Sequence, residues 1–262
     1  MNFYIPLRDS IHILVSSPLT AILAILQFLL FGTGLLLTIV TEYFAYFHTR
    51  HLPPNHQRLC LEKPDLELFW SASFGAFDHP KFPRGKGAGC VMVQSCCPKS
   101  VGTVRLTRAG ANDVKVDPIV DPNYFAEEED FDIYRRGIVF ARQIGMQMSR
   151  NGYPVEEIFP IEQETKEVLD EYVREHGLSG QHLLSSCRMK PLDEGGVVDQ
   201  ELKVHGIEGL RIADGSILPG MVASRPQATI AMIGERCADF IREGWKLDVV
   251  AGIGKQTDGV HN

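Results

Sequence analysis

The stretch GGVVDQELKVHGIEGLRIADGSILP, residues 195–219, decides the fold together with QHLLSSCRM, residues 181–189, which precedes it. Within the longer stretch, short extended pieces alternate with glycine turns, and a strand over 210–213 ends at Asp214-Gly215-Ser216. A small, sharply turning segment at the end of a strand lets backbone N–H groups approach a phosphate or a ring oxygen. An ordinary turn has the same local pattern, so Asp214-Gly215-Ser216 alone leaves both interpretations open.

A helix is expected directly downstream, over about residues 226–244. Ser224 is a suitable N-cap, and Pro226 lies near the first helical position, where its missing N–H costs nothing. Apolar residues recur there at helical spacing and are expected to form the buried face, namely Ile230, Ile233, Cys237 and Ile241.

Upstream of the decisive stretch, strands come first and helices follow. Strands are expected over 66–74, 90–96 and 102–107, and the turn Pro98-Lys99-Ser100 is expected to join the last two. Helices are expected over about 127–150, where acidic residues at the start complement the helix dipole, and over about 164–176. This order, with few β-α-β alternations, predicts an α+β fold.

Composition and charge exclude several function classes. The net charge is −7 and no basic stripe is present, which excludes a typical nucleic-acid binder. The six cysteines of this 262-residue chain show no C-x-x-C pair and form no disulfide framework, so we expect reduced, mostly buried thiols. No set of histidines and cysteines has metal-ligand spacing, so no metal site is predicted. A G-x-S-x-G nucleophile elbow is also absent, which argues against a hydrolase.

A long apolar run occupies the amino-terminal region. Residues 10–41 contain no Asp, Glu, Lys or Arg, and Leu19–Val40 is long enough to cross a hydrocarbon layer. Arg8 and Asp9 give no net basic region before the run, and the run is too long for a signal peptide. Two interpretations stay open, a transmembrane anchor or a buried helix broken at Gly32-Thr33-Gly34.

The two decisive stretches resemble the carboxy-terminal signature of the glucose–methanol–choline (GMC) oxidoreductases. The resemblance rests on four motifs in the family's order: HxxxSCRM from His182, GGVVD at 195–199, VHGIEGLRIADGSILP at 204–219, and SRPQATI at 224–230. Further upstream, PKSVGTVRL at 98–106 is similar to the family's P-x-S-x-G-x-V strand, and DPNY at 121–124 and LFGTG at 30–34 also fit. The chain looks closest to fungal members, and the resemblance favours the buried-helix interpretation of the apolar run.

The resemblance implies an FAD-dependent oxidoreductase that oxidises the CH–OH group of an alcohol by hydride transfer to the flavin. A histidine beside the flavin acts as the base in this family, and His182 occupies that position. Imidazole suits this task because its pKa lies near neutrality. The resemblance also implies two cofactor-binding segments, Asp214-Gly215-Ser216 and the helix start at Pro226 and Gln227, whose positive end would point at the flavin. Sugars, aryl alcohols, choline and secondary metabolites remain open as substrates.

The sequence departs from the family pattern in three places. No strand–GxGxxG–helix fingerprint for the adenosine diphosphate part of FAD is present. Arg225 stands where the family usually has His or Asn, and an arginine stays protonated, so it cannot act as a base. Arg225 could instead stabilise an alkoxide or reduced flavin, bind an acidic substrate, or mark lost activity. Ser185-Ser186 stands where the family often has Gly-Thr, and the added side chain is expected to crowd the flavin.

By the resemblance, residues 1–175 form the substrate-binding domain, with an apolar helix at 18–40, a sheet over about 66–120 and helices over about 127–176. Residues 176–250 would complete part of an FAD-binding domain, and 251–262 form a loose tail. We expect a truncated family member. The alternative is a non-catalytic remnant that associates with a membrane through residues 18–40 or binds a partner. Family members are cytoplasmic or secreted, with a membrane location as the alternative, and the sequence does not indicate an oligomeric state.

Overall fold

The computed structural model describes residues 1–38, 41–52, 63–72, 85–108, 113 and 115–245. The chain divides into two compact units. Unit 1 contains residues 1–182 and 221–224, and unit 2 contains residues 183–220 and those from 225 onward. Each unit has its own core of buried apolar side chains.

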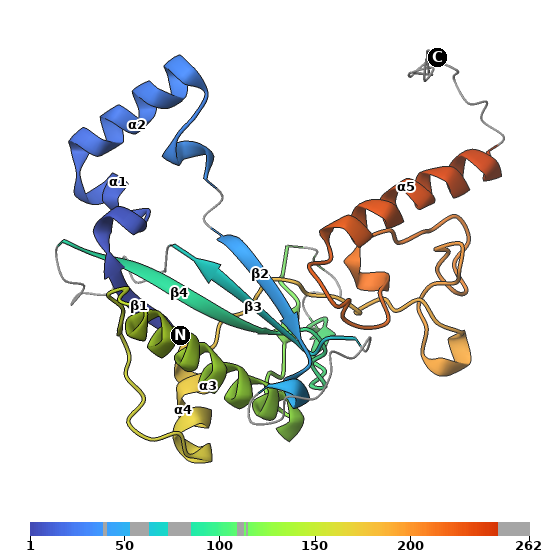
Figure 1. Cartoon of the computed structure of the whole chain (residues 1–262). Helices are drawn as coiled ribbons and strands as arrows, with labels where there is room; N and C mark the ends of the chain where they lie inside the picture. The colour runs from blue at the N-terminus through green and yellow to red at the C-terminus, as the bar shows by residue number, and fades with distance from the viewer. Residues whose placement is uncertain (39–40, 53–62, 73–84, 109–112, 114, 246–262) are drawn as a thin grey trace, which may run out of the picture. The chain divides into compact units, whose positions relative to one another are not determined.

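An antiparallel sheet of five strands forms the centre of unit 1 (Figure 1). Its strand order is β2-β3-β4-β1-β7. The strands are β1 (Asn2–Pro6), β2 (Thr41–Phe47), β3 (Leu66–Ser71), β4 (Lys86–Ser95) and β7 (Glu156–Glu157). The strands predicted at 66–74 and 90–96 are confirmed over 66–71 and 90–95, and residues 73 and 74 lie outside the described residues.

Two helices of unit 1 follow β4 in sequence, as predicted: α3 (Glu128–Arg150) and α4 (Lys166–His176). The short strand β7 lies between them. α3 packs against β3 and β4. A Cβ atom on Gly137 would lie 2.5 Å from Val93 Cγ1 of β4, so this glycine lets the helix approach the sheet closely. Phe131, Ile138 and Ala141 of α3 are buried in the core, on the face that the apolar spacing predicts.

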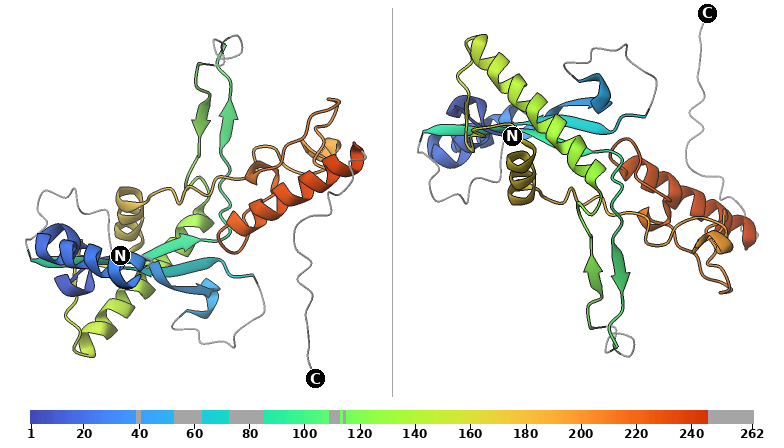
Figure 2. Two further views of the ribbon diagram at one scale, coloured as in Figure 1. Left: turned by 90° about the horizontal axis from the view of Figure 1, so that it is seen from above. Right: turned by 90° about the horizontal axis from the view of Figure 1, so that it is seen from below.

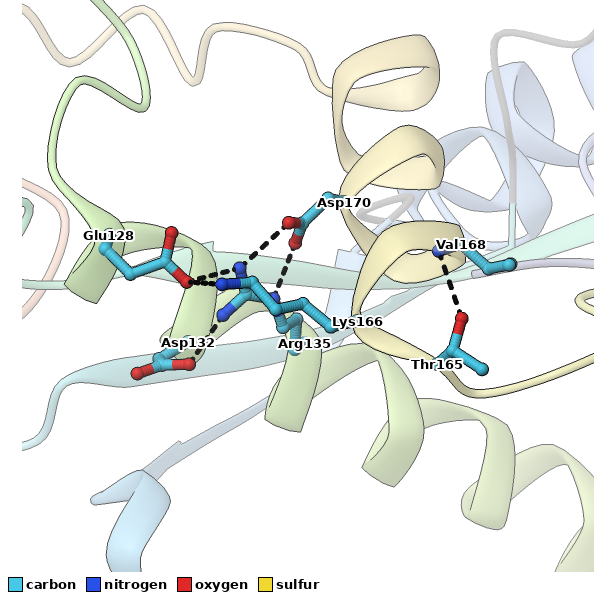
Figure 3. A network of polar contacts seen from close by, with 7 residues as sticks. All are labelled: Glu128, Asp132, Arg135, Thr165, Lys166, Val168 and Asp170. Carbon is cyan, nitrogen blue, oxygen red and sulfur yellow. Dashed lines mark hydrogen bonds and ion pairs between the residues drawn. The ribbon is translucent and has the colours of Figure 1, made fainter.

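A network of charged side chains joins α3 to α4 (Figure 3). Arg135 of α3 donates to both oxygens of Asp170 on α4, from Nε to Oδ1 at 2.5 Å and from Nη2 to Oδ2 at 2.9 Å. It also donates to Asp132 at 2.6 Å and to Glu128 at 2.7 Å, and Lys166 reaches the same Glu128 carboxylate at 2.7 Å. Because the Arg135 and Asp170 side chains are both largely buried, the bidentate pair fixes the two helices to each other.

Strands β5 (Thr103–Arg105) and β6 (Ile119–Asp121) form a separate two-stranded hairpin that extends away from the larger sheet (Figure 2). The segment Pro98-Lys99-Ser100, predicted to join two strands, connects β4 to β5, but these strands do not pair with each other: β4 pairs with β1 and β3, and β5 pairs with β6. The physical reason lies in the turn after β4. The Asp130 carboxylate accepts hydrogen bonds from the N–H groups of Lys99 at 2.7 Å and Ser100 at 2.9 Å, which directs the turn to the start of α3.

The amino-terminal apolar run forms α1 (His12–Ser16) and α2 (Pro18–Phe31). α2 ends at Gly32, whose left-handed backbone (φ 60°) terminates the helix at the predicted break. The expected burial is wrong, because Ala24 is the only buried residue of α2. The helix lies against α1 and the short 3₁₀ helix η2 (Leu35–Leu37), outside the unit 1 core. None of the described helices has the length and apolar character needed to cross a bilayer.

Unit 2 consists of α5 (Gln227–Gly244) and a set of short turns and bridges, including the 3₁₀ helices η5 (Leu192–Glu194) and η6 (Gly215–Ile217). Its core contains Val198, Leu202, Ile217, Ile233 and Cys237.

The start and the buried face of α5 differ in part from the prediction. Ile233 and Cys237 are buried as expected, but Ile241 is 40% exposed. The N-cap is Pro226 rather than Ser224, because the Pro226 carbonyl accepts the first helical hydrogen bond from Ile230 N–H at 2.8 Å.

The α+β fold class is confirmed, and so is the expectation of free thiols in the described residues. Cys90, Cys96 and Cys237 are buried, while Cys60 lies outside the described residues. Burial raises the pKa of the Cys96 thiol to about 12, so this thiol stays protonated and unreactive at neutral pH.

Candidate functional site around His182

His182 is the last residue of a segment that unit 1 holds in place. The Tyr124 hydroxyl donates to Ser179 Oγ at 2.9 Å, and the Gln181 N–H donates to the same oxygen at 3.1 Å. A Cβ atom on Gly180 would lie 3.6 Å from Gln94 Nε2, so the backbone before His182 passes close to β4. The segment is therefore positioned by residues that are far from it in sequence.

The imidazole of His182 is half-buried. Within the described part of the chain it takes part in no hydrogen bond and no ion pair. An imidazole in this state has both ring nitrogens available for a substrate, which is what the predicted role as a base requires.

Two residues around His182 have a left-handed backbone that is uncommon outside glycine. Gln181 has a φ of 57° and Ser185 a φ of 74°. The left-handed conformation costs an L-residue about 1–2 kcal/mol. The glycine that the resemblance implies at the Ser185 position would adopt this backbone without that cost.

The two stretches that decide the fold lie side by side in unit 2. The Cys187 N–H donates to the Ser216 carbonyl at 2.9 Å, and the Ser185 N–H donates to the Gly215 carbonyl at 3.4 Å. The Asp214 carboxylate accepts from the Ser216 N–H at 2.8 Å and closes the turn. The predicted cofactor segment Asp214-Gly215-Ser216 is thus held directly against the residues that follow His182.

A side chain at Gly215 would press on neighbouring side chains in this arrangement. It is buried, and a Cβ atom there would lie 2.8 Å from Leu184 Cδ2 and 3.1 Å from Ile230 Cδ1. Ile230 belongs to the first turn of α5, so the Asp214–Ser216 turn also lies close to the start of that helix.

The remaining predicted residues lie at the start of α5. Arg225 and Gln227 are exposed and Pro226 is buried. No side chain of the described residues caps this helix end. The first N–H groups of a helix have no partner within the helix, so they are available to a ligand oxygen or an anion.

The structure brings only part of the predicted site together. Asp214, Gly215 and Ser216 lie with the 183–189 segment in unit 2, as does Arg225, whereas His182 belongs to unit 1. Sequence reasoning missed Gln94 and the hydroxyls of Tyr124 and Ser179, although the DPNY motif at 121–124 pointed to the neighbourhood of the tyrosine. Among the described residues, no group of three His, Cys, Asp or Glu side chains could hold a metal ion.

Curated relatives match a large part of this chain. Choline oxidase of Arthrobacter globiformis is 40% identical over 189 residues, which cover 70% of this chain and 34% of the relative. The oxygen-dependent choline dehydrogenase of Escherichia coli K12 is 40% identical over 148 residues, or 54% of this chain and 26% of the relative. The chain therefore spans between a quarter and about a third of the length of these relatives.

Solved structures share the fold. A variant of formate oxidase from Aspergillus oryzae RIB40 superposes with a TM-score of 0.79 at 23% identity, over 94% of this chain and 46% of that chain. A fungal aryl-alcohol oxidase gives a TM-score of 0.55 at 31% identity, over 70% of this chain and 28% of that chain. The family model described as GMC oxidoreductase matches residues 98–234, more than half of the sequence. The chain belongs to the GMC oxidoreductase family, whose members are FAD-dependent oxidases and dehydrogenases.

Proposed function

We propose that this chain takes part in an FAD-dependent oxidation in which a CH–OH donor loses a hydride to the flavin and its hydroxyl proton to His182. The observation that carries the proposal is that the His182 imidazole is half-buried and makes no hydrogen bond or ion pair within the described residues. An imidazole with an available ring nitrogen can accept the proton of a hydroxyl group. Family membership supplies the reaction class.

The residues present fit the flavin at two places. The first-turn N–H groups of α5, beginning at Gln227, have no described side-chain cap and would donate to a flavin ring oxygen. The Asp214-Gly215-Ser216 turn holds its backbone in a fixed position through the Asp214–Ser216 hydrogen bond. When bound, FAD supplies the hydride acceptor. The chain's own contribution is to orient the donor and to accept its proton at His182.

Arg225 favours a second candidate donor, a small carboxylate such as formate, which would give up only a hydride and leave as carbon dioxide, with no hydroxyl proton for His182 to accept. A guanidinium group stays charged, binds carboxylates well and repels a quaternary ammonium group such as that of choline. Among the similar solved structures is an arginine-to-lysine variant of Aspergillus oryzae RIB40 formate oxidase, studied for its effect on FAD modification, at 29% identity and a TM-score of 0.63.

The test is reconstitution of the purified chain with FAD, followed by anaerobic mixing with choline, formate or an aryl alcohol. We expect visible flavin absorbance to elute with the protein and to bleach when a donor is added. A chain that retains no flavin after reconstitution would refute the stand-alone enzyme and would leave the non-catalytic alternative.

Two substitutions separate the roles of the residues. His182→Gln should slow flavin bleaching by about 10²–10⁴-fold while flavin binding stays unchanged. His205→Gln is the matched control, because the His205 ring is already occupied by a hydrogen bond between Nε2 and the Lys190 carbonyl at 2.9 Å. Equal loss of rate in both variants would contradict a specific role of His182.

Arg225→Asn tests the second candidate. Removal of a charge-assisted hydrogen bond worth about 1.5–3 kcal/mol should lower the rate with formate by roughly tenfold or more, and the rate with choline should not fall. Arg225→Lys should retain part of the formate rate because it keeps the charge. An unchanged ratio of formate to choline rates in Arg225→Asn would exclude this candidate.

A further inference from the structure

The most exposed apolar element of the described chain is α2. Its large side chains are exposed rather than packed, with Leu19 at 67%, Leu29 at 70% and Phe31 at 73% exposure. Figure 1 shows α2 standing clear of the five-stranded sheet of unit 1. Soluble proteins rarely leave a continuous apolar patch of this kind in water, so the surface needs an occupant.

The apolar side chains extend around most of the helix. At about 3.6 residues per turn, Leu19, Leu23 and Leu30 share one side, while Phe28 and Phe31 lie on the other side. Each of these five side chains is at least 40% exposed. A single flat protein surface would cover only one side of such a helix, whereas a fluid apolar phase would cover all of it.

A second copy of the chain offers too little contact through this element. A helix of 14 residues presents a strip roughly 21 Å long and 10 Å wide. Each partner of a standard protein interface buries about 800 Å². Pairing of two α2 helices would fall short of that area and would leave the outer sides exposed.

Several polar groups of α2 and its flanks have hydrogen-bond partners within the segment itself. Ser17 accepts from the Thr20 N–H at 3.3 Å and from the Thr20 hydroxyl at 2.8 Å, and Gln27 donates to Thr33 at 3.5 Å. The Gly32 N–H donates to the Phe28 carbonyl at 2.9 Å. Since residues 10–41 contain no Asp, Glu, Lys or Arg, this segment can enter an acyl layer without placing a charge in the hydrocarbon.

We propose that α2 inserts into one leaflet of a lipid bilayer and attaches the chain to its surface. At about 1.5 Å per residue the helix is roughly 21 Å long, shorter than a hydrocarbon core of about 30 Å, so it lies tilted toward the membrane plane within one leaflet and does not cross. Leu36 and Leu37 of η2 are also exposed and would extend the inserted apolar surface. Because the segment is uncharged, the attachment depends on apolar contact and not on anionic headgroups. The proposal is independent of the proposed oxidation.

Flotation of the full chain with phosphatidylcholine vesicles tests this directly. We expect the wild-type chain to float with the vesicles, and to do so equally at about 1 M salt, where the Debye length is about 3 Å. Leu23→Lys/Leu30→Lys should lower the floated fraction by at least about tenfold, because lysine is costly in a hydrocarbon layer. Both leucines are more than 50% exposed, so the double variant should keep the circular dichroism of the wild type.

The matched control is Val104→Lys/Ile119→Lys on the β5–β6 hairpin. These two side chains are each 57% exposed, so the control adds the same charge at similar exposure on a different element. It should float like the wild type. In a separate variant, Phe31→Trp, the added fluorescence should shift to the blue with vesicles and be quenched by brominated acyl chains.

Three results would overturn the proposal. The first is a wild-type chain that stays at the bottom of the gradient, which would mean that a polypeptide partner or nothing covers α2. The second is an equal loss of flotation in the α2 and hairpin variants. The third is a wild-type dimer in sedimentation that Leu23→Lys/Leu30→Lys dissociates while vesicles bind neither form.

Discussion

Replacing Gly137 with alanine should destabilise unit 1, although alanine is the better helix former. Gly137 lies inside α3, where glycine costs about 0.5–1 kcal/mol relative to alanine. The new Cβ would lie 2.5 Å from Val93 Cγ1 and 3.1 Å from Leu66 Cδ1. Leu66 is fully buried and has no free space to move into. Overpacking of this kind costs about 1–3 kcal/mol, so the net loss should be about 1–2 kcal/mol.

Urea unfolding followed by far-ultraviolet circular dichroism measures this loss. With a slope of about 2 kcal/mol per molar urea, the midpoint should fall by roughly 0.5–1 M. Gly234→Ala in α5 is the matched control, because no atom lies within 4 Å of its ideal Cβ. That substitution should instead stabilise unit 2 by about 0.5–1 kcal/mol. Amide hydrogen exchange, followed in peptides from unit 1 and from unit 2, shows which unit each substitution stabilises or destabilises.

A double-mutant cycle tests the cause of the Gly137 effect. Val93→Ala removes the methyl group that the new Cβ would strike, so this substitution should destabilise Gly137→Ala protein less than it destabilises the wild type. The reasoning would be refuted if Gly137→Ala matched or exceeded the wild type in stability. Strict additivity of the two substitutions would equally show that contact with Val93 is not the cause.

Three further substitutions have defined outcomes. Asp170→Asn should destabilise unit 1 by about 3 kcal/mol in urea unfolding, because the buried Arg135 charge loses its bidentate partner. The control is Arg236→Gln, which removes an exposed ion pair with Asp239 and should change stability by less than about 1 kcal/mol. Hydrogen bonds from Lys166 and Arg135 hold the pKa of Glu128 below its usual 4.5. The Glu128 carboxylate therefore stabilises the fold at pH values above 4.5, and this stabilisation is lost as the pH falls through the lowered pKa. Glu128→Gln should therefore flatten the stability–pH curve below about pH 5. Ser185→Gly should raise stability by about 1–2 kcal/mol in calorimetry by relieving the left-handed serine.

The helices could be predicted from the sequence because their signals are local. α3 and α4 carry acidic starts, apolar spacing of three and four, and clear stop residues at Asn151-Gly152 and Gly177. The N-cap of α5 could not be settled in this way, since Ser224 and Pro226 are both reasonable starts by residue type. The backbone of Pro226 and its hydrogen bond to Ile230 decide between them.

The sheet was harder to predict because pairing depends on distant residues. β2 reads TEYFAYF, an aromatic stretch without clean alternation that follows the apolar run, and it was not recognised. The turn signal at Pro98-Lys99-Ser100 is local and does not indicate which strands pair, while Asp130 lies about 30 residues further on and holds that turn by hydrogen bonds.

The candidate site could be located from the motifs but not assembled from them. The hydrogen bonds between Cys187 and Ser216 and between Ser185 and Gly215 join residues whose sequence spacing carries no periodic signal. The contact of Gly180 with Gln94 depends on where β4 lies in the sheet, which no local pattern specifies.

The two ends of the five-stranded sheet should behave differently in concentrated solution. β7 closes one end with only two residues, Glu156 and Glu157, and their charges discourage another chain from docking there. β2 forms the other end, and its outer edge pairs with no strand among the described residues. Tyr43 and Phe44 of β2 are exposed, so this edge combines open backbone groups with apolar rings. Aggregation of the chain should therefore start at β2, and the substitution Tyr43→Lys should delay it.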